Sequence, residues 1–191
     1  SPVLPYIVTC WVLGVFGLAI WHLGGWVQMQ KLRRRLVSNV EENIARKSSD
    51  LAEAMGIRKT VEVLRSMLVE VPTVVGHFKP VILLPASAMS GLAVDEIEAL
   101  LAHELAHIKR HDYLVNIFQA AFEILGFYHP AVWWISARIR NEREKCCDDM
   151  AVKFSGDGVR YAKALTTIEE MRLSRQRLAM AAGGGNLLNR I

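Results

Sequence analysis

The stretch Leu101-Ala-His-Glu-Leu-Ala-His-Ile-Lys-Arg110 decides the fold of the chain around it. Its pattern H-E-x-x-H puts His103 and His107 four residues apart, on one face of a helix, where two imidazoles can bind one metal ion. Neutral imidazole suits zinc, and a catalytic zinc takes three protein ligands and a water, which Glu104 is placed to deprotonate. The pattern therefore predicts one zinc ion per chain; the alternative is two histidines that only make hydrogen bonds.

The residues around this pattern predict a helix. Asp95 and Glu96 stand where the helix dipole favours acids, and Lys109 and Arg110 stand near the other end, where it favours cations. Between them, apolar residues recur at helical spacing, namely Ile97, Leu100, Leu101, Leu105 and Ile108. We therefore expect the helix to pack by an apolar face while it presents the two histidines to a site.

The composition fits one domain with a sizeable core and a membrane segment. Hydrophobic residues make up 52% of the 191 residues, and the formal net charge is +4. The three cysteines, Cys10 and the adjacent pair Cys146 and Cys147, form no disulfide framework and fit a reducing compartment. Because the chain begins at Ser1 rather than Met, we expect it to be part of a longer protein.

The run from Tyr6 to Val27 predicts a transmembrane helix. It has no formal charge and spans about 33 Å as a helix, enough for a bilayer core. A signal peptide would have a basic start and a small-residue cleavage site, and neither is clear. The basic cluster Lys31-Leu-Arg-Arg-Arg35 marks the cytoplasmic end of the span, so no direct nucleic-acid binding is expected from it. The expected order is an extracytoplasmic end (1–5), a transmembrane helix (6–27) and a cytoplasmic basic stalk and linker (28–58), helical to about Arg46.

Three short apolar runs before the zinc motif predict strands. Residues 60–64 alternate, and residues 71–76 and 80–85 are punctuated by proline and glycine. We expect a small, mostly antiparallel sheet, whose edge could hold an extended peptide. The fold class is then α+β, with the N-terminal transmembrane helix followed by a mainly helical zincin domain over residues 59–175. Residues 176–191 are expected to form a flexible linker toward a C-terminal part outside this sequence.

A second apolar stretch, residues 113–137, predicts a helical hairpin that turns between Gly126 and Pro130. Basic residues flank both ends, which favours the same side of the membrane for both. The hairpin is expected to be either a soluble core element or one partly sunk in the membrane.

The third zinc ligand is expected downstream, in Glu144-Lys-Cys-Cys-Asp148. The two carboxylates are again at i and i+4 on a predicted helix, so one can bind the metal while the other accepts a hydrogen bond from a ligating imidazole. A single membrane crossing between His107 and Glu144 would separate the ligands by about 30 Å, which argues against it. Rival ligands are Glu142, Asp149, Cys146 and Cys147.

These residues carry a resemblance to a family. The stretches 80–85, 101–112, 128–134 and 142–148 resemble the integral-membrane zinc metallopeptidases of the β-lactam sensor-transducer (antirepressor) family. The resemblance implies a gluzincin in which His103, His107 and Glu144 bind zinc and Glu104 is the catalytic base. It also implies that Asp148 supports a ligating imidazole.

The resemblance further implies a multi-pass protein of a bacterial cytoplasmic membrane, with its peptidase domain on the cytoplasmic side. The expected function is hydrolysis of a cytoplasmic regulator, such as a transcriptional repressor, or of the protein itself; a homodimer would suit such a sensor. Two alternatives stay open: a non-catalytic signalling or scaffold module, and a membrane quality-control protease. The candidate oxyanion stabilisers are His111, His129, Arg160 and Tyr161.

Overall fold

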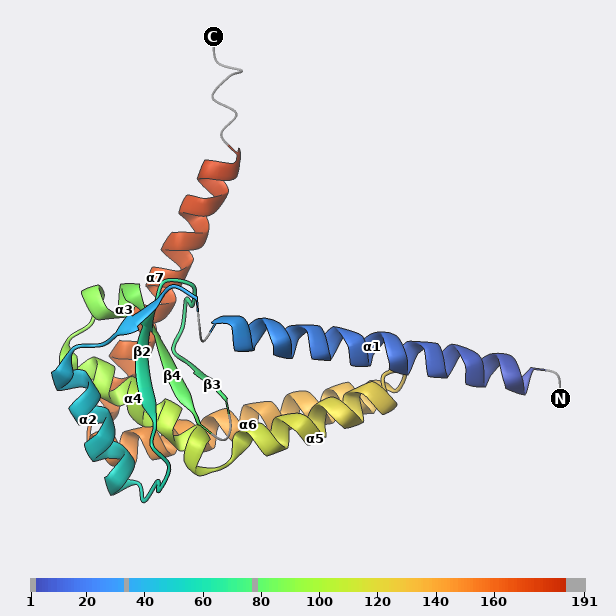
Figure 1. Cartoon of the computed structure of the whole chain (residues 1–191), viewed down its shortest axis with the longest axis horizontal. Helices are drawn as coiled ribbons and strands as arrows, with labels where there is room; N and C mark the ends of the chain where they lie inside the picture. Colours follow the sequence, from blue (N-terminus) through green and yellow to red (C-terminus); the bar gives the residue numbers. More distant parts are fainter. Residues whose placement is uncertain (1–2, 33–34, 77–78, 185–191) are drawn as a thin grey trace, which may run out of the picture.

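The computed structural model describes residues 3–32, 35–76 and 79–184, in which long helices project from a body that contains a small sheet (Figure 1). The helices are α1 (Leu4–Leu32), α2 (Glu42–Ala54), α3 (Ala86–Gly91), α4 (Val94–Lys109), α5 (Asp112–Leu125), α6 (Pro130–Ser155) and α7 (Gly158–Gly184). The strands are β1 (Val37–Asn39), β2 (Glu62–Ser66), β3 (Thr73–Val75) and β4 (Val81–Pro85). The expected α+β class, with an apolar N-terminal helix and a small sheet, is confirmed.

The sheet has the strand order β1-β2-β4-β3. β2 pairs parallel with β4, while the outer strands β1 and β3 pair antiparallel with β2 and β4. The prediction of a mostly antiparallel sheet is therefore right. Every residue of β4 is buried, as its unbroken apolar sequence requires of a strand covered on both faces.

Helix α4 lies at the centre of the body and packs against α2, α6, α7 and β3 (Figure 1). The apolar side chains expected to cover one face, among them Leu101 and Leu105, are fully buried in the main core. At the start of the helix the Glu96 carboxylate accepts a hydrogen bond from the backbone N–H of Ala93 (2.9 Å), and its other oxygen lies 2.9 Å from Nζ of Lys163 on α7. The residues that carry the zinc motif are thus fixed on the most deeply packed helix.

The expected helical stalk to Arg46 is wrong. Helix α1 ends at Leu32, and β1 and α2 follow within the segment assigned to the stalk. The tertiary contacts explain the difference, because Val37 pairs with Ser66 of β2 and α2 buries Ile44 and Leu51 in the core. Helix α2 then ends just before Gly56, whose φ of 73° lies in the left-handed region that favours glycine.

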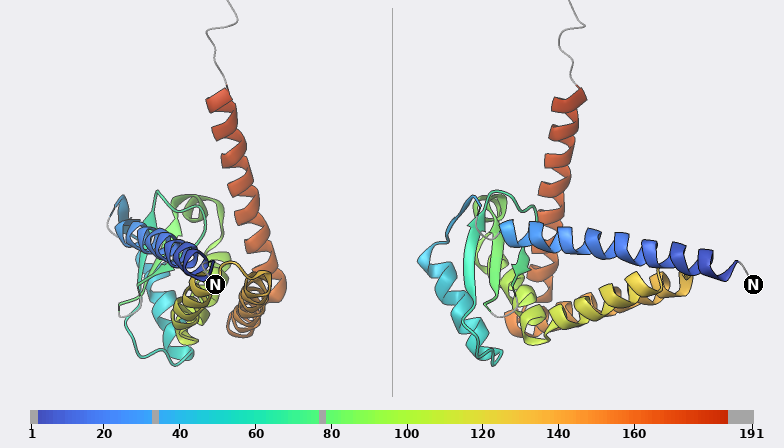
Figure 2. Two further views of the ribbon diagram at one scale, coloured as in Figure 1. Left: turned by 90° about the vertical axis from the view of Figure 1, so that its right-hand side faces the viewer. Right: turned by 45° about the vertical axis from the view of Figure 1, so that its right-hand side comes forward.

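Helices α5 and α6 form the predicted helical hairpin, which turns at residues 126–129. Together with α1 it projects from the same side of the body, and its tip meets α1 (Figures 1 and 2). Helix α1 is the one helix among the described residues that is long and apolar enough to cross a membrane. Helix α7 continues to Gly184, beyond the expected end near Arg175, so residues 176–184 of the expected linker are helical; residues 185–191 lie outside the described part of the chain.

Candidate metal centre

Helix α4 presents His103 and His107 side by side, as their spacing predicts. The two Nε2 atoms are 3.2 Å apart, and the rings meet edge to face. Both imidazoles are partly exposed, while the residues between them, Glu104, Leu105 and Ala106, are buried. Burial, together with the neighbouring His107, lowers the pKa of His103 and favours the neutral form, which is the form that binds metal.

Helix α6 brings Glu144 to the same point. Its Oε2 lies 3.6 Å from Nε2 of His103 and 3.7 Å from Nε2 of His107. Ligands that sit about 2.0 Å from a tetrahedral zinc are separated by about 3.3 Å, so the triangle of these three atoms has the size that zinc requires. The donor set of two neutral imidazoles and one carboxylate also fits zinc.

Asp112 contacts the His107 ring at Nδ1, on the side away from the candidate metal position. The chain turns at His111, which has a left-handed φ of 57°, and α5 then begins with Asp112, whose Oδ2 lies 2.7 Å from Nδ1 of His107. The carboxylate is buried and also lies 3.4 Å from Nε of Arg110 and 3.8 Å from Nε of Arg143. A hydrogen bond donated from Nδ1–H fixes the tautomer that leaves Nε2 of His107 free for a metal.

Asp148 and Tyr161 hold His103 in the corresponding way. Nδ1 of His103 lies 3.0 Å from Oδ1 of Asp148 and 2.7 Å from the Tyr161 hydroxyl, which in turn donates to Asp148 (2.6 Å). Burial, and then the Asp148 carboxylate, raises the pKa of Tyr161, so its hydroxyl stays a donor. Each imidazole therefore has its own carboxylate on the side away from the candidate metal position.

Cys147 lies behind His107, on the side away from Glu144. Its Sγ is 3.3 Å from Nδ1 of His107 and 3.5 Å from Oδ2 of Asp112, and the side chain is fully buried. Burial raises the pKa of this thiol, so the neutral form dominates, whereas a zinc ligand must be a thiolate. With Arg110 and Arg143 beside Asp112, the group of His107, Asp112 and Cys147 is a poor second site for a cation.

Glu104 is 9% exposed and lies next to the ligand cluster. Burial, and then the neighbouring Glu144 carboxylate, raises its pKa to about 8. A carboxyl group with a pKa near neutrality can both take and return a proton, which is what a general base in hydrolysis needs.

Other residues considered from the sequence lie elsewhere. His129 caps α6 at the hairpin tip, roughly 20 Å along that helix from Glu144, so it cannot stabilise an oxyanion at this site. The His111 ring packs on Tyr113, and Arg160 pairs with Asp95 and Asp157.

Of the rival ligands, Glu142 pairs with Arg138 and Lys145 at the surface, and Cys146 is exposed. Among the four oxyanion candidates, Tyr161 contacts the candidate ligand His103, and its contacts suit it to orient that imidazole.

Asp112 stands at the start of α5, where the helix dipole favours an acid, and the structure gives it the further contact with His107. The feature of the sequence that could have indicated the contact between Asp112 and His107 is an acid directly after the short turn that ends α4. The pairing depends on the left-handed residue His111, which nothing in the local composition requires.

Comparison with known proteins decides the family of this chain. The model of the BlaR1 peptidase M56 family matches residues 1–191. The chain belongs to this family. It is 29% identical over 143 residues to the regulatory protein BlaR1 of Bacillus licheniformis, covering 75% of this chain and 24% of the relative. It is 28% identical over 110 residues to the methicillin resistance mecR1 protein of Staphylococcus aureus, covering 56% of this chain and 19% of the relative.

The comparisons confirm the predicted resemblance to sensor-transducer metallopeptidases. The chain spans about a quarter or less of the length of the curated relatives it matches. Membership of a metallopeptidase family implies a metal, and the cluster of His103, His107 and Glu144 is a group in this chain that could hold one.

Proposed function

We propose that this chain is the zinc endopeptidase part of a membrane-bound sensor-transducer. The observation that carries the proposal is the triangle of Nε2 of His103, Nε2 of His107 and Oε2 of Glu144, with the buried Glu104 beside it. A purely structural zinc site has no use for a base between its ligands, so Glu104 favours a peptidase over a scaffold module.

The residues divide the work of hydrolysis as follows. His103, His107 and Glu144 would hold the zinc ion, which supplies Lewis acidity to the scissile carbonyl and acidity to a bound water. Glu104 would accept a proton from the attacking water and would later return it to the amine that leaves. Asp112 orients His107, and Asp148 with Tyr161 orients His103, so that both Nε2 atoms face the metal position.

The substrate is proposed to be a cytoplasmic regulatory protein of the repressor type, or the protein itself. The names of the relatives, a regulatory protein and a methicillin resistance protein, support a role in signalling rather than in digestion. The apolar helix α1 supports a membrane location, and the bacterial relatives support a bacterial membrane. The basic residues around the end of α1 support a metal centre on the cytoplasmic side.

The test begins with the metal content of the chain purified in detergent, wild type beside His103→Ala. We expect about one zinc per wild-type chain and loss of most of it in the variant. Glu104→Gln should keep its zinc but lose nearly all cleavage of a repressor added to the purified protein. A wild type that folds without zinc, or a Glu104→Gln variant that cleaves at the wild-type rate, would refute the peptidase assignment.

A further inference from the structure

The α5–α6 hairpin is polar inside and apolar outside. Along its inner side Gln119 donates to the backbone oxygen of Ser136 (3.0 Å), Glu123 pairs with Arg140 (2.6 Å), and Asn116 accepts from Arg143. Gln119, Glu123 and Ser136 are buried. This is the reverse of a hairpin in water, where the seam between two helices is apolar.

Large apolar side chains cover the outer surface of the hairpin. Phe118 is 63% exposed and Trp134 is 71% exposed. The same surface carries Ile117, Phe122, Leu125, Tyr128, Trp133 and Ile135. From Ile117 to Ala137 no exposed side chain carries a formal charge when His129 is neutral. Such a large continuous apolar patch is not left against water.

Four backbone carbonyl groups at the hairpin tip accept hydrogen bonds from within the protein. The carbonyl oxygen of Leu125 accepts from the indole N–H of Trp11 (3.1 Å), and that of Phe127 accepts from the indole of Trp133 (2.8 Å). The carbonyls of Phe122 and Gly126 accept from the N–H groups of Gly126 and His129, both at 2.9 Å. A turn that is surrounded by hydrocarbon needs these bonds, because no water is there to replace them.

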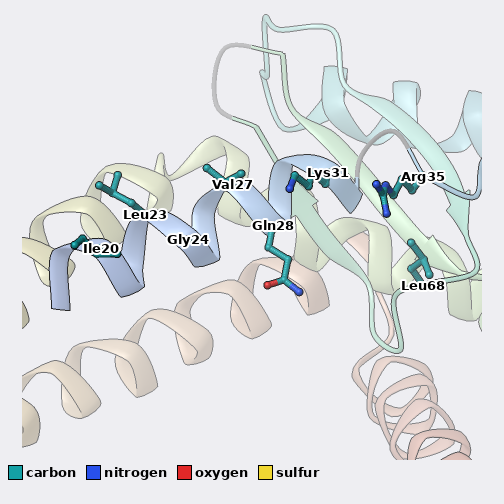
Figure 3. Close-up of a pocket in the computed structure, with 8 residues that line it drawn as sticks. All are labelled: Ile20, Leu23, Gly24, Val27, Gln28, Lys31, Arg35 and Leu68. Carbon is teal, nitrogen blue, oxygen red and sulfur yellow. The ribbon is translucent and has the colours of Figure 1, made fainter. Parts of the chain in front are cut away.

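The contact with α1 gives the depth of the tip. Trp11 reaches Leu125, and Gly14 faces the ring of Phe127. Gly14 lies about 25 Å along α1 from Lys31, close to the thickness of a bilayer core of about 30 Å. A groove beside the last turns of α1 passes from apolar Ile20 and Leu23 to Lys31 and Arg35, which marks the polar end of the span (Figure 3).

We propose that the α5–α6 hairpin is inserted in the lipid bilayer beside α1, with residues 117–137 surrounded by acyl chains and both of its ends on the side of the metal centre. The occupant of the apolar outer surface is lipid hydrocarbon, because that surface is continuous with α1, the helix that can span the membrane. Asp112 and Glu144 lie at the hairpin base, so the metal centre stands at the membrane surface. The hairpin would lie in the bilayer whether or not the metal centre cleaves peptides.

The test is spin-label electron paramagnetic resonance of the chain in lipid nanodiscs, where both faces of the bilayer are open to water-soluble reagents. Single cysteines replace Phe118 or Trp134 in a Cys10→Ser, Cys146→Ser background, in which Cys147 is buried and unreactive. Ile20→Cys on α1 serves as the lipid reference, and Glu53→Cys on α2, on the opposite side of the body from the hairpin, serves as the water reference (Figure 1). All four side chains are exposed, so the substitutions leave the core intact.

The collision rates of the label with oxygen, which concentrates in lipid, and with a water-soluble nickel chelate give the result. We expect F118C and W134C to match I20C, with an oxygen-to-nickel ratio several-fold above that of E53C. Labels at Phe118 and Trp134 that behave like the one at Glu53 would overturn the proposal. Low collision rates with both reagents would also overturn it, since a second copy of the chain would then cover the surface.

Discussion

The carboxylate of Asp112 lies 2.7 Å from Nδ1 of His107, across the turn between α4 and α5. This contact joins the last turns of α4, which carries His103 and His107, to the first residue of α5. His107 therefore has its orientation set by a residue of the neighbouring helix, and the metal position depends on how the two helices meet.

Replacing Asp112 with asparagine should weaken metal binding without removing a ligand. The amide can no longer fix the His107 tautomer as a carboxylate does, and losses of about 10- to 100-fold in metal affinity are typical of such partners. Competition with a zinc chelator measures the change. Asp50→Asn, at an exposed acid of α2, should leave the affinity unchanged.

Replacing Glu144 with glutamine should lower zinc retention far more than the same change at Glu142. Glu144 completes the proposed ligand triangle, whereas Glu142 makes surface ion pairs on the same helix with Arg138 and Lys145. Zinc content after dialysis against a mild chelator distinguishes them. Equal retention in the two variants would remove Glu144 from the ligand set.

Replacing Glu96 with glutamine should make stability less dependent on pH in the acid range. The hydrogen bond with Lys163, and then the Ala93 N–H, lowers the pKa of Glu96 below 4.5. A lowered pKa means that the stabilisation is fully present above the unfolded pKa and is lost as the pH falls through the folded one. At pH 7 we expect the variant to lose about 1 kcal/mol of unfolding free energy, a usual cost for a damaged helix cap.

Thermal unfolding in detergent, from pH 7 downward, measures this difference. The gap between wild type and Glu96→Gln should close as the pH falls below 4.5. Glu170→Gln, at an exposed position of α7, is the control and should follow the wild type throughout. A gap of constant size at every pH would contradict the assigned role of the carboxylate.

Replacing Gly14 with valine should separate α1 from the hairpin tip. A Cβ at this position would overlap the Phe127 ring, whereas a Cβ at Gly17, one turn further along α1, meets open space. The Trp11 bond to Leu125 should be lost with the contact, and the melting temperature in detergent should fall by several degrees for Gly14→Val. Gly17→Val should melt as the wild type does.

The sequence predicts those parts of the site that follow from spacing along one helix. His103 with His107, and Glu144 with Asp148, are pairs at i and i+4, and the structure places each pair on one helix face. The sequence also predicts the α5–α6 hairpin, because glycine and proline interrupt an apolar run there. What the sequence missed depends on contacts between distant segments: β1 forms only by pairing with β2, and Tyr161 reaches His103 from α7.

Helix α6 runs without a break from Pro130 at the hairpin tip past Glu144 to Ser155. Glu144 stands about 20 Å from the tip along a stiff rod, so a tilt of about 5° about the tip moves it by about 2 Å. Metal–ligand distances tolerate only about 0.2 Å. The angle at which the hairpin leaves the body therefore helps to set the geometry of the proposed metal centre, because a change of that angle displaces Glu144, the proposed third ligand.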